Sequence, residues 1–218
     1  MDDRQSESVK SYLLERLVNG SYGFGEKISA KIVSEEVGAS RFTVNAVFNE
    51  LRRDGFLDII PQVGCRVSSP SLAEIGDFFL MFSRIESVLA ELAAERWTAN
   101  QLTAIRRANE RIEDLEADKE SSATDYRLYN LEFHQAVHQA AHSPRIADEQ
   151  KTRWVRADFY VTHSKGFAER VHESVKEHEL VIEAIGARDA RKAGKAMGSH
   201  IAQLGRDVVK GISANRSV

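Results

Sequence analysis

The spacing of apolar residues predicts that most of this chain is helical. Apolar side chains recur at helical spacing between residues 6 and 19. Two shorter helices are predicted over residues 29–37 and 40–54, with Gly38 in the tight turn between them. Ser40 is of the residue type that caps the N-terminus of a helix, so we expect the third helix to begin there.

Two short strand-like runs follow the third helix, at residues 57–60 and 65–68. The segment between them begins with Pro61 and ends with Gly64, which is typical of a hairpin. Helix, helix, turn, helix and hairpin is the order of elements in a winged helix-turn-helix. We therefore predict that residues 1–70 form a winged helix-turn-helix domain.

The rest of the chain, residues 71–218, shows helical periodicity and no convincing strand. A long amphipathic helix is predicted over residues 71–97, and five further helices follow it with short connections. We place these five from Thr98, over residues 124–141, from Ser143, over residues 168–187 and over residues 189–211. Short connections predict an antiparallel bundle. The expected fold class is therefore mainly α, with an N-terminal winged helix-turn-helix and a C-terminal all-α bundle.

Composition leads us to expect a cytoplasmic protein. No apolar run approaches the roughly 20 residues that a membrane-spanning helix needs, and the first eight residues lack the apolar core of a signal peptide. Cys65 is the only cysteine, which excludes an internal disulfide and fits a reducing compartment. We interpret Cys65 as a small buried residue of the hairpin rather than as a redox switch, because only Arg66 lies beside it to activate a thiolate.

Charge alone argues against a nucleic-acid partner. The chain has a formal net charge of −3, and residues 1–70 contain 9 Lys and Arg against 10 Asp and Glu. A DNA-binding module usually has a basic footprint. Basic residues can nevertheless gather on one face of a fold, and a residue count does not reveal such an arrangement.

A specific motif argues for DNA. The segment from Ala39 to Leu57 (ASRFTVNAVFNELRRDGFL), followed by Pro61 and Gly64, resembles the winged-helix signature of the GntR family of transcription regulators. The resemblance implies that Ser40 and Arg41 face DNA, where a helix N-terminus and a cation both suit phosphate. Thr43 and Asn45, further along the helix, would reach base edges.

The chain departs from this signature at several positions. Asn45 stands where many relatives have a second arginine, Gln62 and Val63 replace basic or histidine residues of the wing, and Lys31 replaces an arginine of the second helix. Fewer positive groups lower non-specific affinity, whereas Asn45 could read an adenine through two hydrogen bonds. The DNA-binding residues expected from the resemblance are Lys31, Ser40, Arg41, Thr43, Asn45, Gln62 and Gly64.

The second part of the chain resembles the FCD effector domain of FadR-type regulators over residues 71–211. The resemblance rests on residues 85–94, 130–134, 177–189 and 197–201. In that family a divalent metal is held by an aspartate, by a histidine four residues later on one helix, and by two histidines from later helices. By position these correspond to Asn130, His134, His178 and His200. Residues i and i+4 share a helix face, imidazole suits zinc or nickel, and an open coordination position could accept a carboxylate effector.

Asn130 is the main departure from the FCD pattern, because its neutral amide is a weaker ligand than a carboxylate. Three alternatives to a metal site ligated by Asn130 therefore stay open. The histidines could hydrogen-bond an anionic effector without metal, they could be ordinary core residues, or His138 could replace the missing ligand. Arg84, Arg153 and Arg156 are candidates for guiding a carboxylate effector into the bundle.

The sequence gives no support for an enzyme. A di-iron bundle needs two Glu-x-x-His motifs, and only residues 169–172 provide one. Nucleophile elbows, phosphate loops and dinucleotide-binding turns are also missing from the sequence. We therefore expect a ligand-responsive repressor of metabolic genes that binds a palindromic operator as a homodimer. The alternative is a metal-binding helical protein whose N-terminal domain mediates protein contacts.

Overall fold

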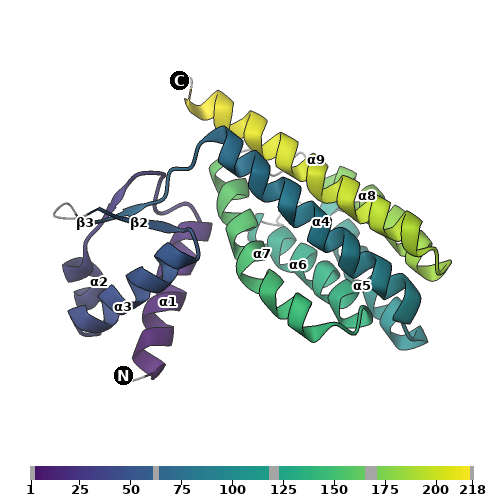
Figure 1. Ribbon diagram of the computed structural model, residues 1–218, viewed down its shortest axis with the longest axis horizontal. Coiled ribbons are helices and arrows are strands. Elements are labelled where there is room, and N and C mark those ends of the chain that lie inside the picture. Colours follow the sequence, from purple (N-terminus) through teal and green to yellow (C-terminus); the bar gives the residue numbers. More distant parts are fainter. Residues whose placement is uncertain (1–2, 61–63, 118–122, 165–170, 217–218) are drawn as a thin grey trace. The chain divides into compact units, whose positions relative to one another are not determined.

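The computed structural model describes residues 3–60, 64–117, 123–164 and 171–216. The chain divides into two compact units. Unit 1 comprises Met1–Ser71 together with Val155–His163, and unit 2 comprises Leu72–Trp154 together with Ser164–Val218. Figure 1 labels the helices and strands of both units.

Unit 1 contains a small helical core and a three-stranded antiparallel sheet. Its elements are α1 (Asp3–Val18), β1 (Lys27–Ile28), α2 (Ala30–Val37), α3 (Arg41–Arg53), β2 (Leu57–Ile60) and β3 (Gly64–Val67). The strand order is β1-β3-β2, with Ile28 opposite Cys65 and Leu57 opposite Val67. This is the predicted winged helix-turn-helix. Strand β1 was not predicted, because a two-residue strand has almost no pattern of its own and exists through its pairing with β3.

Local signals explain the helix-turn-helix. The Ser29 hydroxyl accepts a hydrogen bond from the Ile32 N–H and caps α2 at its start. Gly38 ends α2 with a φ of 69°, a left-handed conformation that glycine adopts without steric cost. Ser40 then caps α3 by accepting a hydrogen bond from the Thr43 N–H at 3.1 Å. The two caps fix the turn between the helices, so the start of α3 is set by the sequence itself.

Unit 2 is built from helices. They are α4 (Leu72–Arg96), α5 (Ala99–Ala117), α6 (Ala123–Ala140), α7 (Pro144–Ser164, whose second half belongs to unit 1), α8 (Val171–Gly186) and α9 (Ala190–Arg216). Helices α4 and α9 run side by side (Figure 1). Their close approach depends on glycines of α9, since a Cβ atom at Gly205 would lie 2.4 Å from the Phe79 Cβ, and one at Gly194 would lie 2.3 Å from a Glu91 carboxylate oxygen. The expected fold class, mainly α with a C-terminal helical bundle, is confirmed.

The interior of unit 2 is apolar but contains an unusual set of buried polar side chains. Among them are Glu86, Asn109, His134, His138, His178 and His200. Burying a polar group is costly unless it finds a partner, so such a set points to a site. Across the described ranges of the chain, none of the helices combines the length and the apolar character that crossing a bilayer requires.

Candidate functional site

The exposed surface of α3 begins at its capped N-terminus. Arg41, Phe42 and Asn45 are exposed there, and Phe42 retains 75% of its accessible surface. Thr43 differs from these neighbours, because its side chain is 6% exposed and its hydroxyl lies 2.9 Å from that of Ser40. Of the residues expected on this helix, Ser40, Arg41 and Asn45 therefore lie at the surface, while Thr43 faces the core.

The other expected DNA contacts lie on α2 and in the wing. Lys31 is exposed on α2, with its ammonium 3.9 Å from the Glu35 carboxylate. Gly64 is exposed at the start of β3, opposite Ile60, and has a φ of 117° that favours glycine. Gln62 lies outside the described residues. The role of each in DNA binding stays a prediction.

Phe42 is a surface residue of α3 that our interpretation of the sequence did not single out. A signal was present, because an aromatic residue at position 42 falls outside the apolar stripe formed by Val44, Val47, Phe48 and Leu51. A single exposed apolar side chain is common on protein surfaces, but Phe42 is the most exposed of the large hydrophobic residues that the structure describes and lies next to Arg41 at the start of α3. The sequence pattern could therefore have identified it.

Cys65 is buried in β3, as expected. Burial raises the pKa of its thiol to about 12, and the nearby Asp58 carboxylate adds to this effect. The thiol is therefore protonated and unreactive at neutral pH, which fits a structural role.

Three histidines from three helices meet in the interior of unit 2. They are His134 on α6, His178 on α8 and His200 on α9, and one ring nitrogen from each lies within 4.8 Å of the others. All three side chains are buried, at 0%, 0% and 3% exposure. The structure thus brings together three of the four residues expected to bind a metal.

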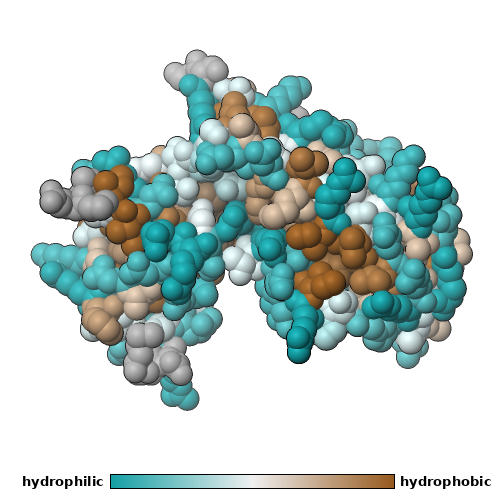
Figure 2. Space-filling view, in the orientation of Figure 1, coloured by the Kyte–Doolittle hydropathy of each residue, from teal (hydrophilic) through white to brown (hydrophobic). Residues whose placement is uncertain are grey.

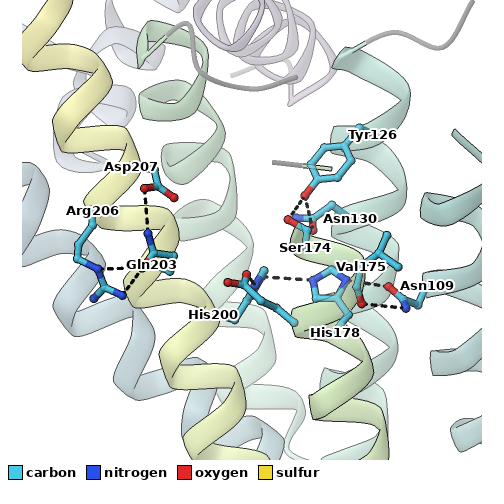
Figure 3. Close-up of polar contacts among 11 residues, drawn as sticks. Asn109, Tyr126, Asn130, Ser174, Val175, His178, His200, Gln203, Arg206 and Asp207 are labelled. Carbon is cyan, nitrogen blue, oxygen red and sulfur yellow. Dashed lines mark hydrogen bonds and ion pairs between the residues drawn. The ribbon is translucent and has the colours of Figure 1, made fainter. Parts of the chain in front are cut away.

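Hydrogen bonds orient two of these rings (Figure 3). The Asn109 amide nitrogen donates to the Val175 carbonyl, which leaves its oxygen to accept a 3.0 Å hydrogen bond from His178 Nδ1. His200 Nδ1 donates to the Glu177 carboxylate at 2.7 Å. Each ring therefore carries its proton on Nδ1, and the two Nε2 atoms face each other at 3.3 Å.

His134 is held beside a buried carboxylate. Its Nδ1 lies 3.6 Å from Glu86 Oε2, and neither ring nitrogen of His134 has a hydrogen-bond partner among the described residues. Burial lowers the pKa of His134 to about 4, and the Glu86 carboxylate offsets part of this effect. The ring is therefore neutral at physiological pH, which is the form that binds metal.

Glu86 keeps its charge although it is fully buried. Burial raises its pKa, but the interactions of the carboxylate with His134 and His138 outweigh burial and hold the pKa at about 2. The carboxylate accepts hydrogen bonds from His138 Nε2 at 2.9 and 3.0 Å and from Trp154 Nε1 at 3.3 Å. His138 is thus bound to Glu86 and is not part of the group of three histidines.

The three histidines could hold a divalent cation. Two imidazole lone pairs at 3.3 Å repel each other unless a proton or a cation lies between them. The unpaired nitrogens of His134 also need a partner, because a buried polar atom without one is destabilising. Three neutral imidazoles, two of them oriented by a second residue, form a donor set that suits zinc or nickel.

Asn130, the fourth expected ligand, lies one turn before His134 on α6 and is partly buried. Its side-chain oxygen is 3.4 Å from the Tyr126 hydroxyl, which also donates to the Ser174 hydroxyl at 2.6 Å. Figure 3 shows Asn130 beside Tyr126 and Ser174. Its role as a metal ligand stays a prediction.

The three arginines expected to guide a carboxylate lie in different places. Arg84 is exposed on α4, Arg153 donates to the Glu149 carbonyl one turn earlier in α7, and Arg156 lies in unit 1 with its guanidinium 5.9 Å from the Phe56 ring. A role in effector binding stays a prediction for each.

The residues that orient the histidines were not predicted. The sequence pattern could have identified Glu86, because this residue occupies an apolar stripe of α4 that includes Phe79, Phe82 and Leu89 at spacings of three and four residues. A glutamate on a buried helix face is rare unless it has a partner. No comparable sequence pattern distinguishes Asn109 or Glu177 from other polar residues of their helices.

Two protein-family models match separate parts of the chain. Residues 5–67 match the family model described as bacterial regulatory proteins of the gntR family, and residues 77–203 match the FCD domain. Among curated proteins, the Uxu operon regulator of Haemophilus influenzae is 23% identical over 216 residues, covering 91% of this chain and 80% of the relative. The HTH-type transcriptional repressor RspR of Escherichia coli is 24% identical over 186 residues, covering 84% and 80%.

Solved structures show the same fold. E. coli McbR/YncC superposes with a TM-score of 0.75 at 18% identity, covering 94% of this chain and 97% of that one. A putative GntR transcriptional regulator from Rhodococcus sp. RHA1 also has a TM-score of 0.75, at 16% identity, covering 95% and 98%.

Proposed function

This chain belongs to the GntR family of bacterial transcription regulators and carries an FCD domain, and from this premise we propose that it is an effector-responsive repressor that binds a palindromic operator as a homodimer. The matched families and curated relatives are regulators of transcription rather than enzymes.

The exposed N-terminal turn of α3 supports the DNA contact. Arg41 stands beside the free backbone N–H groups of a capped helix start, an arrangement that suits phosphate. Phe42 is exposed next to it and suits contact with the methyl group of a thymine. Asn45, on the same side of the helix, can read an adenine. We leave Thr43 out of the contact surface, because it faces the core.

Selection of binding sites from randomised duplex DNA tests this function. The full chain should enrich an inverted repeat, because a two-fold dimer sets two recognition helices against equivalent half-sites. Enrichment of a single half-site would contradict the dimer. Failure to enrich any sequence over the starting pool would instead support a protein-contact role for the N-terminal domain.

A repressor role draws its support from the curated relatives. The E. coli relative is named a transcriptional repressor, and the H. influenzae relative is named a regulator of the Uxu operon. An effector that releases the repressor from DNA must bind one of the two conformations of the protein more tightly than the other. A ligand shifts the equilibrium between two conformations only through this difference in affinity.

We assign a divalent metal, zinc or nickel, to His134, His178 and His200. Three imidazoles leave more than one coordination position open, and a bound cation would supply a positive centre for a carboxylate effector. The Asn130 amide is the fourth ligand expected by position. The hydrogen bonds from His178 to Asn109 and from His200 to Glu177 support the assignment, because they leave both Nε2 atoms free to bind.

Elemental analysis of protein purified without a histidine tag or chelator tests this assignment. We expect bound metal, and we expect added zinc to raise the melting temperature of chelator-treated protein, because metal that binds the folded state stabilises it. His178→Ala and His200→Ala should abolish that rise, and Asn130→Asp should strengthen binding. His172→Ala is the matched control, because His172 is exposed on α8 outside the cluster. A native chain that neither contains metal nor responds to zinc would support a metal-free effector pocket instead.

Helix α4 supports the homodimer. Leu80, Met81 and Val88 are exposed on this helix at 57%, 45% and 43%. Figure 2 shows hydrophobic surface on the face of unit 2 that carries α4, framed by hydrophilic residues. Exposed apolar patches of this kind commonly mark protein interfaces.

A further inference from the structure

A buried carboxylate connects the histidine cluster to a second feature of unit 2. Glu86 lies between two histidines of α6, with His134 Nδ1 at 3.6 Å on one side and His138 Nε2 at 2.9 Å on the other. His134 belongs to the cluster of three histidines, and His138 does not. Glu86 is therefore shared between the cluster and a group outside it.

His138 forms part of the wall of a pocket between α5, α6 and α7, with a volume of about 540 Å³. This volume lies in the range of pockets that bind small molecules. Because His138 Nε2 donates to the Glu86 carboxylate, Nδ1 of the neutral ring carries a lone pair. No described residue donates a hydrogen bond to that Nδ1, so it is available to a ligand in the pocket.

The other walls indicate the chemistry of that ligand. Lys151 and Asp148 line the pocket as an ion pair at 2.7 Å, so their charges compensate each other. Gln135 and Gln139 add side-chain amides, which both donate and accept hydrogen bonds. Such walls suit a neutral molecule with hydroxyl or N–H groups better than an anion.

We propose that this pocket is a second ligand site, for a small neutral compound that donates a hydroxyl or N–H hydrogen bond to His138 Nδ1, and that Glu86 couples its occupancy to the histidine cluster. The coupling to metal rests on the proposed metal site. The ligand site itself rests on the pocket and on His138.

The sign of the coupling follows from the shared carboxylate. A hydrogen bond received at Nδ1 makes the Nε2–H of His138 a stronger donor to Glu86. The carboxylate then attracts the Nδ1–H group of His134, 3.6 Å away, less strongly, which lowers the basicity of the other nitrogen of His134. Partners of this kind tune metal affinity through the ligand that they orient. Occupancy of the pocket therefore weakens metal binding, and metal weakens ligand binding by the same factor.

A tethered hydroxyl tests the proposal without knowledge of the natural ligand. Gln135 lines the pocket, is exposed, and lies three residues before His138 on the same helix, so the two side chains are neighbours. Gln135→Cys is labelled with 2-hydroxyethyl methanethiosulfonate, or with the ethyl reagent, which lacks the O–H group. Leu128→Cys, exposed on α6 outside the pocket wall, is the position control. The native chain treated in the same way checks that the buried Cys65 stays unlabelled.

The first readout is the dissociation constant for zinc. We expect the hydroxyethyl label at position 135 to weaken zinc binding about threefold to tenfold relative to the ethyl label, which is less than the 10- to 100-fold loss typical when such a partner residue is removed. The two labels at position 128 should give equal constants. Equal constants at position 135 would overturn the coupling.

The second readout is the ¹⁵N chemical shift of the His138 and His134 rings in metal-free protein. The hydroxyethyl label should move both sets of signals relative to the ethyl label. If the chain binds no zinc with either label, the proposed metal site fails, and the ring signals alone decide the present proposal. Movement of both rings would support it, whereas movement of His138 alone, or of neither ring, would overturn it.

Discussion

At the scale of single residues, the histidine cluster depends on which nitrogen of each ring carries the proton. Asn109 and Glu177 each accept from an Nδ1 atom, so the Nε2 atoms of His178 and His200 point their lone pairs into the same space. A core histidine that served packing alone would instead pair its two nitrogens with a donor and an acceptor. The orientation of these rings therefore favours a bound cation over an ordinary core.

DNA binding can also be tested at single residues. Arg41→Ala should weaken operator binding by about 1–3 kcal/mol, because a guanidinium at the helix start contacts a base edge or a tightly held phosphate. Arg145→Ala, an exposed arginine of α7, is the matched control and should leave binding unchanged. Fluorescence anisotropy with labelled operator measures both. Equal affinity of the two variants, with α-helical circular dichroism intact, would remove Arg41 from the interface.

The buried His134 predicts a specific dependence of stability on pH. Burial lowers its pKa to about 4 in the folded chain, whereas an unfolded histidine titrates near 6.5. Between these pH values the unfolded chain binds a proton that the folded chain does not, so the free energy of unfolding falls as the pH decreases. His134 therefore contributes stability that is present above pH 6.5 and lost as the pH falls toward 4.

Urea denaturation of metal-free protein at pH 7 and pH 5 measures this contribution. The native chain should lose more stability between the two pH values than His134→Gln, which has no titrating ring. His142→Gln, at an exposed position, should behave like the native chain. If His134→Gln lost as much stability as the native chain, His134 would not be buried in its neutral form.

At the scale of elements, the sequence predicts the helices and turns that are set by capping residues, glycines and apolar periodicity. The Ser40 cap and the Gly38 turn placed the boundary between α2 and α3 within a residue, and apolar periodicity found every helix from α4 to α9. Strand β1 was missed because its two residues are defined by their partners in β3.

The residues of the histidine site also differ in how far the sequence could predict them. Only the resemblance to FCD domains linked His134, His178 and His200, since their positions in the sequence are too far apart for any local rule. The roles of Glu86 and Asn109 depend on which helix packs against which, and no local pattern records that.

The close packing of α4 against α9 gives a prediction at this scale. Gly205→Ala should lower the free energy of unfolding by about 1–3 kcal/mol, because the new Cβ would lie 2.4 Å from the Phe79 Cβ, an atom that cannot move without its helix. Gly76→Ala on α4 is the control: nothing lies within 4 Å of its Cβ position, so the alanine should stabilise the helix by about 0.5–1 kcal/mol. Denaturation midpoints of the two variants measure both effects. A loss of stability at Gly76 equal to that at Gly205 would contradict this view of the α4 and α9 contact.

At the scale of the whole molecule, recognition of a palindrome requires two copies of the chain. Sedimentation at micromolar concentration should give twice the chain mass of 24.4 kDa. Leu80→Glu places a charge in the exposed apolar surface of α4 and should shift the protein toward monomer. Leu180→Glu, on α8 and similarly exposed at 53%, is the control and should leave the assembly unchanged. A native chain that sediments only as a monomer would contradict the dimer.

The central claim is that this chain recognises specific DNA through α3. Gel-shift with the intergenic DNA upstream of its own gene, with and without a chelator, tests the claim most directly. We predict a shifted complex that unlabelled fragment competes away and scrambled DNA does not, that is weaker for Arg41→Ala, and whose affinity changes when metal is removed. Equal retardation of the upstream fragment and of scrambled DNA, by the native chain and by Arg41→Ala alike, would contradict it.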